Sequence, residues 1–164
     1  MRSHPAPLFP IIAVGPFTKW GVDYIMCKPV STGGHKYIIV AVDYFTKWAE
    51  AMPTFKADDE TAAFFVFNQI VTLFEIPKEI VTDHGSHFQN SMMTKLATML
   101  GFKQDRFSSF YPQANGQFKE INKTLKTILK CTIKATWSNW HIILYPSLWT
   151  YRTNVTTTMG FSPF

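Results

Sequence analysis

Two aspartates in apolar surroundings are the first residues of this chain that suggest chemistry. Asp23 lies in the segment WGVDYI (20–25), and Asp83 lies in the segment VTDHGSHF (81–88). A hard cation such as Mg²⁺ prefers carboxylate oxygens as ligands, so two aspartates brought together by a fold are candidates for a divalent-metal site. Taken singly, an aspartate in a strand or before a glycine turn is more often an ordinary structural residue, so the assignment depends on the rest of the chain.

Short apolar strands must position these aspartates. Runs rich in β-branched and aromatic residues predict strands at 20–26, 35–42, 45–52 (ended by Pro53), 79–82 and 102–107. Gly33-Gly34 predicts a hairpin between the first two strands. The strand at 79–82 delivers Asp83 at its end.

Helical patterns follow the first three strands. They predict helices at about 60–74, 90–100, 113–135 and 138–151. The first opens with Asp58-Asp59-Glu60 at the positive end of its dipole, and we expect its apolar residues, which include Phe64 and Phe67, to be largely buried. Strands followed by helices that alternate with two more strands predict an α/β fold, a mixed five-stranded sheet flanked by helices.

The two aspartate segments and a third one, YPQANGQFKEINK (111–123), resemble in order the three motifs of the retroviral and retrotransposon integrase catalytic core. The resemblance is nearest to gypsy-type transposable elements, and segments 37–50 and 148–153 extend it. It implies a ribonuclease-H-like fold. The prolines at the start of the chain predict an extended Pro-rich segment over 1–15. The resemblance covers a catalytic-core-like domain over 16–164, which we expect to be shortened at its C-terminal end.

The resemblance implies a polynucleotidyl transferase that uses two Mg²⁺ (or Mn²⁺) ions for DNA integration. It assigns Asp23 and Asp83 as catalytic metal ligands. In the family a glutamate stands 36 positions after the second aspartate and three before an asparagine. Counted from Asp83 or back from Asn122, that position holds Lys119 here.

A lysine cannot take the third carboxylate's role. Its ammonium group has three donors and no lone pair, and its charge repels divalent cations. Glu120 is one position late and points about 100° away on a helix, yet it remains open as a substitute ligand. Asp43 is interpreted as structural. We therefore expect weakened metal binding and weak or absent activity.

These residues favour the integrase catalytic-core domain of a retrotransposon, a nucleic-acid-binding protein with impaired catalysis. The alternative is a non-catalytic DNA-binding or dimerising module derived from an integrase. A weaker third hypothesis is a ribonuclease-H-like nuclease with a rearranged carboxylate set.

The predicted helix 113–135 carries a stripe of lysines about 150° around from its apolar stripe. These lysines are Lys119, Lys123, Lys126, Lys130 and Lys134. They form either a solvated face or a surface that follows a DNA backbone, and the absence of acidic residues among them favours DNA. Gln113 and Asn115, just ahead, are candidates for further DNA contacts.

The composition sets bounds on partners and location. The net charge of +5 fits a polyanion, and nothing indicates sequence-specific reading, so duplex DNA with little specificity is the expected partner. The tryptophans of the C-terminal part, among them Trp140 and Trp149, suit a core or a homodimer interface. The two cysteines form no disulfide framework, and no apolar run reaches membrane-span length. We expect an intracellular protein, nuclear if functional, with no membrane partner.

Overall fold

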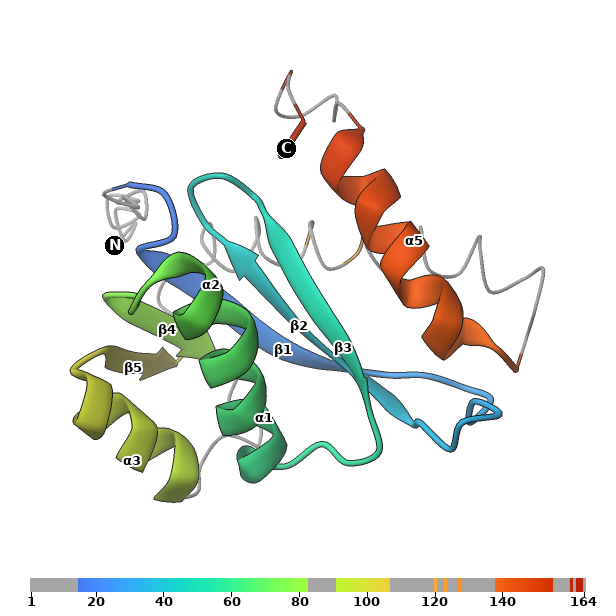
Figure 1. Cartoon of the computed structure of the whole chain (residues 1–164), viewed down its shortest axis with the longest axis horizontal. Helices are drawn as coiled ribbons and strands as arrows, with labels where there is room; N and C mark the ends of the chain where they lie inside the picture. Colours follow the sequence, from blue (N-terminus) through green and yellow to red (C-terminus); the bar gives the residue numbers. More distant parts are fainter. Residues whose placement is uncertain are drawn as a thin grey trace, which may run out of the picture.

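The computed structural model describes residues 15–82, 91–106 and 138–154, with the single positions 120, 123, 127, 160, 162 and 163. In these ranges five strands form one sheet in the order β3-β2-β1-β4-β5 (Figure 1). The strands are β1 (Lys19–Met26), β2 (Tyr37–Asp43), β3 (Ala49–Thr54), β4 (Glu79–Thr82) and β5 (Lys103–Arg106). β1, β2 and β3 pair antiparallel, whereas β4 pairs parallel with both β1 and β5. The predicted mixed five-stranded sheet is confirmed.

Helices flank this sheet. α1 (Asp59–Val66) continues through a π-helical stretch, η1 (Phe67–Val71), into the short α2 (Thr72–Phe74). The other described helices are α3 (Ser91–Leu100) and α5 (Trp140–Thr153). None of the helices in the described part of the chain is long and apolar enough to cross a membrane. Of the predicted helix 113–135, positions 120, 123 and 127 are described and are helical.

Local chemistry explains where the helices begin and end. The Asp58 side chain accepts the backbone N–H of Thr61 at 2.9 Å and caps α1. Gly101 follows α3 with φ +81°, a left-handed conformation that glycine adopts without strain and that commonly ends a helix.

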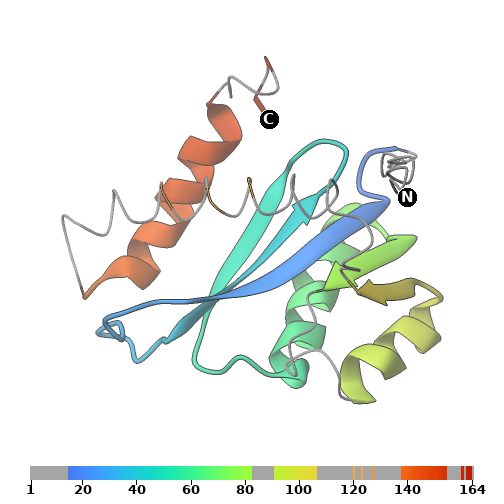
Figure 2. The ribbon, with the colours of Figure 1, turned by 180° about the vertical axis from the view of Figure 1, so that it is seen from behind.

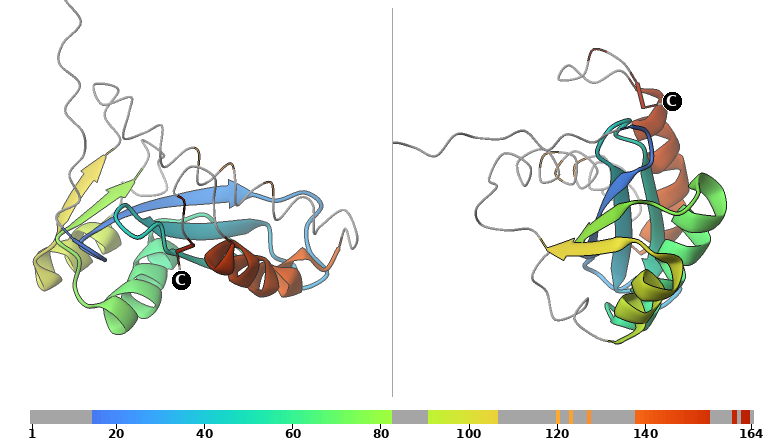
Figure 3. Two further views of the ribbon diagram at one scale, coloured as in Figure 1. Left: turned by 90° about the horizontal axis from the view of Figure 1, so that it is seen from above. Right: turned by 90° about the vertical axis from the view of Figure 1, so that its left-hand side faces the viewer.

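Side chains alternate between the two faces of the sheet, and each face has its own core. α1 and α3 lie beside each other over one face (Figure 3). The core on that face includes Trp20, Val22, Ile39, Ala41, Phe65 and Met93. α5 packs on the other face, beside β3, with a core that includes Ile25, Ile38, Val40, Val42, Trp140 and Leu144. Seen from behind, β1 crosses the middle of the sheet between β2 and β4 (Figure 2).

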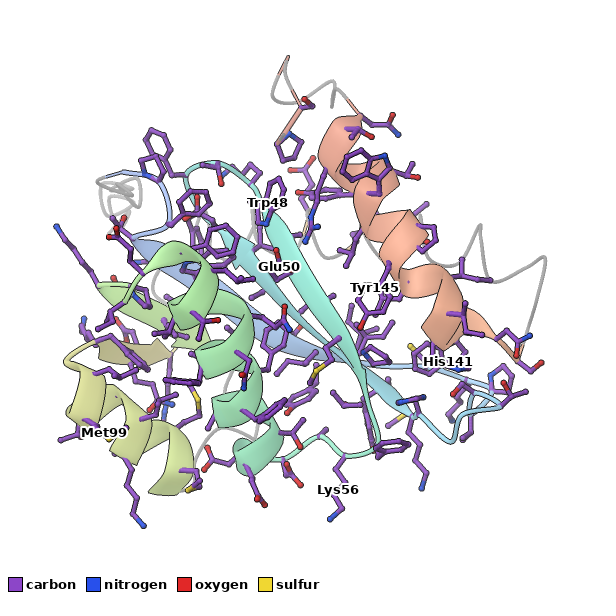
Figure 4. All side chains as sticks on the ribbon, viewed as in Figure 1. Trp48, Glu50, Lys56, Met99, His141 and Tyr145 are labelled. Carbon is purple, nitrogen blue, oxygen red and sulfur yellow. The ribbon has the colours of Figure 1, made fainter. Side chains whose placement is uncertain are left out.

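The C-terminal end of α5 is fastened to the edge strand β3. The Arg152 guanidinium donates twice to the Ala49 carbonyl, from Nε at 2.9 Å and Nη2 at 2.6 Å. Its Nη2 also lies 2.8 Å from Glu50 Oε1, and the group stacks over the Trp48 ring at 4.3 Å. Figure 4 shows Trp48, which directly precedes β3, near Glu50 of β3. Arg152 thereby satisfies a carbonyl on an open sheet edge and locks α5 in place.

The predicted third strand, 45–52 with Pro53 as its end, was misplaced. β3 begins at Ala49 and runs past Pro53 to Thr54, and Pro53 pairs with Ile38. Proline is tolerated here because β3 is an edge strand, where a missing N–H removes no ladder hydrogen bond. The first residues of the expected strand form a turn, in which Thr46 donates its N–H to Asp43 Oδ2 at 2.7 Å.

The expectation that the apolar residues of the first helix are largely buried was wrong for two phenylalanines. Phe64 is 59% exposed and Phe67 is 42% exposed, whereas Phe65 and Ile70 are fully buried. A helix lying on a sheet presents one stripe to it. This helix is apolar on more than that stripe, so its outer phenylalanines face away from the core.

Candidate functional site

Asp23 lies in the middle of the sheet, on the central strand β1. It pairs with Val40 of β2, and its side chain is on the face that α5 covers, because it shares the alternation of Ile25. The carboxylate is half-buried, and its Oδ1 accepts the backbone N–H of Tyr24 at 2.8 Å. A partly accessible carboxylate on a rigid strand is suited to hold a cation.

The register of the parallel strands bears on the second aspartate. Val22 of β1 pairs with Thr82 of β4, and Thr82 is 1% exposed. In the sequence, Asp23 directly follows Val22, and Asp83 directly follows Thr82. Asp83 itself lies outside the described residues.

The third motif is described at two of its positions. Glu120 and Lys123 are both helical and exposed. The other predicted residues of this region lie outside the described residues: Lys119, Lys126, Lys130, Lys134, Gln113 and Asn115. The structure therefore places Asp23 on the sheet and Glu120 and Lys123 on a helix, and it leaves the predicted grouping of the site untested.

A metal site can be tested only against the described donors. Within the described ranges, no three His, Cys, Asp or Glu side chains come together as a metal-binding group. Of the two family aspartates, the structure describes Asp23, a carboxylate with access to solvent on a strand, which is the chemistry that a hard cation requires. The described residues thus supply one aspartate of the expected ligand set.

Asp43 lies on the opposite face of the sheet from Asp23. It pairs with Trp20, whose side chain belongs to the core beneath α1. It is fully buried, and its Oδ2 accepts both the N–H and the hydroxyl of Thr46, at 2.7 and 2.6 Å. Asp43 therefore organises the turn between β2 and β3, in agreement with its structural interpretation.

Tyr24, next to Asp23, is a hydrogen-bond donor and not a candidate nucleophile. Its hydroxyl donates to the Asp58 carbonyl at 2.7 Å. Burial, and then the neighbouring charge of Asp58, raise the pKa of Tyr24 well above its ordinary value. The phenol stays protonated at neutral pH and fixes β1 against the start of α1.

One positioning residue escaped the sequence analysis. Asp59, 3% exposed, accepts the backbone N–H of Met92 at 2.7 Å and that of Met93 at 3.2 Å, both through Oδ2. It therefore caps α3 from α1. The acidic start of the first helix was visible in the sequence, but a cap that joins two separate helices has no local signal.

Comparisons with known proteins complete the assignment. The family model of the integrase core domain matches residues 13–112, more than half of the chain. The chain belongs to the integrase core family. The integrase core predicted from the three motifs is thereby confirmed, whereas the gypsy-type origin stays a prediction.

Retroviral polyproteins are among the relatives of this integrase core. The chain is 31% identical over 150 residues to the Gag-Pol polyprotein of baboon endogenous virus (strain M7), an alignment covering 91% of the chain and 9% of that protein. It is equally identical, with 91% and 14% coverage, to the Pol polyprotein of feline endogenous virus ECE1. The chain thus corresponds to a small part of these polyproteins.

The fold also matches a solved structure. A chain in the cryo-EM structure of the simian T-cell lymphotropic virus intasome, in complex with the PP2A regulatory subunit B56 gamma, superposes with a TM-score of 0.81 at 20% identity. The match covers 98% of this integrase core and 58% of that chain. The predicted ribonuclease-H-like fold is confirmed.

Proposed function

We propose that this integrase core descends from a gypsy-type retrotransposon enzyme for DNA integration, and that this copy binds DNA but is catalytically impaired. The observation that carries the proposal is the motif set, in which Asp23 and Asp83 keep the family's aspartates and Lys119 replaces its glutamate. The Val22–Thr82 pair supports a shared location for the two aspartates, because each residue of the pair immediately precedes one of them.

Mg²⁺ or Mn²⁺ ions, when bound, activate an attacking oxygen and stabilise a leaving oxygen in phosphodiester exchange. Asp23 would supply a carboxylate ligand to such a site, and its strand β1 is held in place by pairing with β2 on one side and β4 on the other. Lys119 contributes a positive charge and no lone pair, which lowers metal affinity. Glu120, exposed on its helix, is the remaining acidic candidate in the third motif.

DNA is the proposed partner. Lys123 is exposed on the helix of the third motif, as a phosphate contact requires, and Lys126 and Lys130 recur at helical spacing from it. The net charge of +5 has the sign that a polyanion attracts. A domain that acts on chromosomal DNA works in the nucleus, which is the proposed location.

A second copy of the chain is the other proposed partner. Ile142, Tyr145 and Trp149 of α5 are 62%, 56% and 58% exposed. Their spacing of three and four residues places them on one face of the helix, opposite its buried side. An exposed apolar stripe of this kind marks an interaction surface. It also favours the alternative function, a dimerising DNA-binding module without catalysis.

The test is a nicking and strand-joining assay in Mn²⁺. Wild-type protein is compared with Lys119→Glu, and the double variant Asp23→Asn with Lys119→Glu is the control that lacks a metal ligand. We expect weak or no turnover in the wild type, a gain in Lys119→Glu and its loss in the double variant. Robust wild-type turnover that Asp23→Asn abolishes contradicts the impairment, and DNA binding without turnover in any variant supports the non-catalytic alternative.

A further inference from the structure

The loop between β1 and β2 is fastened to the start of α5 by contacts that the proposed function does not use. Thr32 donates its N–H to the Ser138 carbonyl at 2.7 Å and its hydroxyl to Asn139 Oδ1 at 2.6 Å. The Trp140 indole donates to the Pro29 carbonyl at 3.0 Å. We name residues 29–35 and 138–141 together the hairpin–α5 joint. Figure 4 places His141 at the beginning of α5, beside this loop.

Two histidines stack inside the hairpin–α5 joint. The rings of His35 and His141 have centroids 5.0 Å apart and planes 28° apart, and His35 also stacks on Phe55 at 4.3 Å. Gly33 lies close to both rings, because a Cβ added there would be 3.0 Å from His141 Nε2 and 3.0 Å from His35 Nδ1. The joint closes tightly around the imidazole pair.

The surroundings disfavour a charge on His35, and they leave one His141 nitrogen buried without a partner. Ser31 Oγ accepts the His35 N–H at 3.0 Å and lies 3.2 Å from His35 Nδ1, so its hydroxyl proton is available to that nitrogen when the ring is neutral. His141 Nδ1 is buried with no hydrogen-bond partner among the described residues, and its ring is at the positive end of the α5 dipole. Burial, and then His141, lower the pKa of His35.

No acidic group offsets these effects in the part of the chain that the structure describes. The contacts of the two rings are with Ser31, Phe55, Trp140 and each other. The charged residues nearest in sequence on the packed elements are the cations Lys28, Lys36 and Lys56. Protonation of both rings therefore places like charges side by side without a counter-ion.

We propose that the hairpin–α5 joint is a pH-sensitive latch, closed when His35 and His141 are neutral and released when they are protonated. The docked state holds fewer protons than the open state, so stability of the joint rises with pH. The latch is closed above the ordinary histidine pKa of about 6.5 and opens as the pH falls below it. Because the loop continues from β1, which carries Asp23, the latch couples the central strand to α5.

The donor set argues against a bound metal in place of a proton switch. A transition metal in a protein is usually held by three or four side-chain donors. The stacked pair supplies two imidazoles, and within the described ranges no three His, Cys, Asp or Glu side chains come together. Proton binding needs only one nitrogen of each ring, so it is the event to which this pair can respond.

The experiment is hydrogen exchange of the full chain, read by mass spectrometry at pH 7.5, 6.5 and 5.5 and corrected for intrinsic exchange rates. Peptides over 27–36 and 138–145 report the joint, and α3 is the internal reference. We expect exchange in the joint to rise on the order of three- to tenfold from pH 7.5 to pH 5.5, with α3 unchanged. A double variant, His35→Gln with His141→Gln, should lose this dependence.

Thr32→Val is the matched control. It breaks the bond to Asn139 and loosens the joint at every pH, but it keeps the histidines and so the pH dependence. Histidine resonances of the wild type provide a second measurement that needs no variant, and the docked His35 ring should titrate below the ordinary histidine range. The latch is overturned by pH-independent exchange in the wild type, by unchanged dependence in the double variant, or by Zn²⁺ tightening the joint at pH 7.5 through these histidines.

Discussion

Val22 of β1 lies opposite Thr82 of β4 in the parallel part of the sheet, and one family aspartate follows each of them in the sequence. Adjacent parallel strands run in the same direction, so Asp23 continues β1 at the end of the β1–β4 pairing from which the chain continues to Asp83. The first two motifs of the integrase core therefore belong to two neighbouring strands. The third motif is helical at Glu120 and Lys123, and it is the motif that departs from the family pattern.

Removal of the lysine stripe should weaken DNA binding in a salt-dependent manner. In the triple variant Lys123→Ala, Lys126→Ala and Lys130→Ala, each lost phosphate contact lowers the slope of log affinity against log salt by about 0.9. Fluorescence anisotropy of a labelled duplex over a salt series measures this slope. The charge-matched control is a triple alanine variant at the exposed residues Lys28, Lys36 and Lys56. Equal losses in both variants would show that net charge, and not the stripe, attracts DNA.

Asp59 should be among the most sensitive acidic positions for stability. Its replacement by alanine leaves the N–H groups of Met92 and Met93 without their carboxylate. We expect a loss of about 1–3 kcal/mol in the free energy of unfolding, measured by urea titration. Asp59→Asn keeps one acceptor oxygen, so its free energy of unfolding should fall by less. Glu60→Ala, an exposed neighbour in the same helical turn, is the control, and an equal effect there rules out the cap between α1 and α3.

Arg152 should be irreplaceable by lysine. Lysine keeps the charge near Glu50 but lacks the planar guanidinium that bonds the Ala49 carbonyl twice and stacks on Trp48. We expect Arg152→Lys to cost about 1–2 kcal/mol and Arg152→Met, which leaves the mostly buried Glu50 carboxylate without its cation, to cost about 3 kcal/mol. Thermal unfolding of both variants measures the difference. If lysine is neutral, the ion pair alone fastens α5 to β3.

The sequence predicted most of the sheet because its strands are apolar runs ended by turn residues. The faces of β1 and β2 follow from simple alternation, and α3 ends at Gly101, directly after the predicted helix 90–100. β3 was misplaced because proline was taken as a strand end, and an edge strand is the one setting where proline does not end the ladder.

Tertiary polar contacts were beyond sequence reasoning. The Asp59 cap, the Arg152 clamp and the His35–His141 stack join residues 33, 103 and 106 positions apart, respectively. No local pattern encodes such pairs, because each depends on how elements pack after the sheet has formed. Asp23 could be singled out from the sequence because its motif is local, and its role as a ligand and its grouping with Asp83 and Lys119 stay predictions.

We expect the exposed apolar residues of α5 to form the contact between two copies of the chain. Trp149→Glu places a charge on the exposed surface formed with Ile142 and Tyr145. If a second copy covers this surface, sedimentation velocity should show a dimer for the wild type and a monomer for the variant. Met99→Glu, at an exposed apolar residue of α3, is the control and should leave the dimer intact. A wild type that stays monomeric at high concentration removes the homodimer from the proposal.

The decisive substitution is Lys119→Glu, which returns a carboxylate to the family's third position. It removes a cation that repels divalent metals and adds an oxygen ligand, so both changes raise metal affinity. Calorimetry with Mn²⁺ should show weak binding at best in the wild type and clear binding in Lys119→Glu that Asp23→Asn abolishes. Lys119→Gln separates the two causes, because it removes the charge without supplying a carboxylate. If Gln restores affinity as well as Glu, repulsion was the whole defect. If neither variant gains affinity, position 119 does not face Asp23, and Glu120 becomes the residue to test as the third ligand.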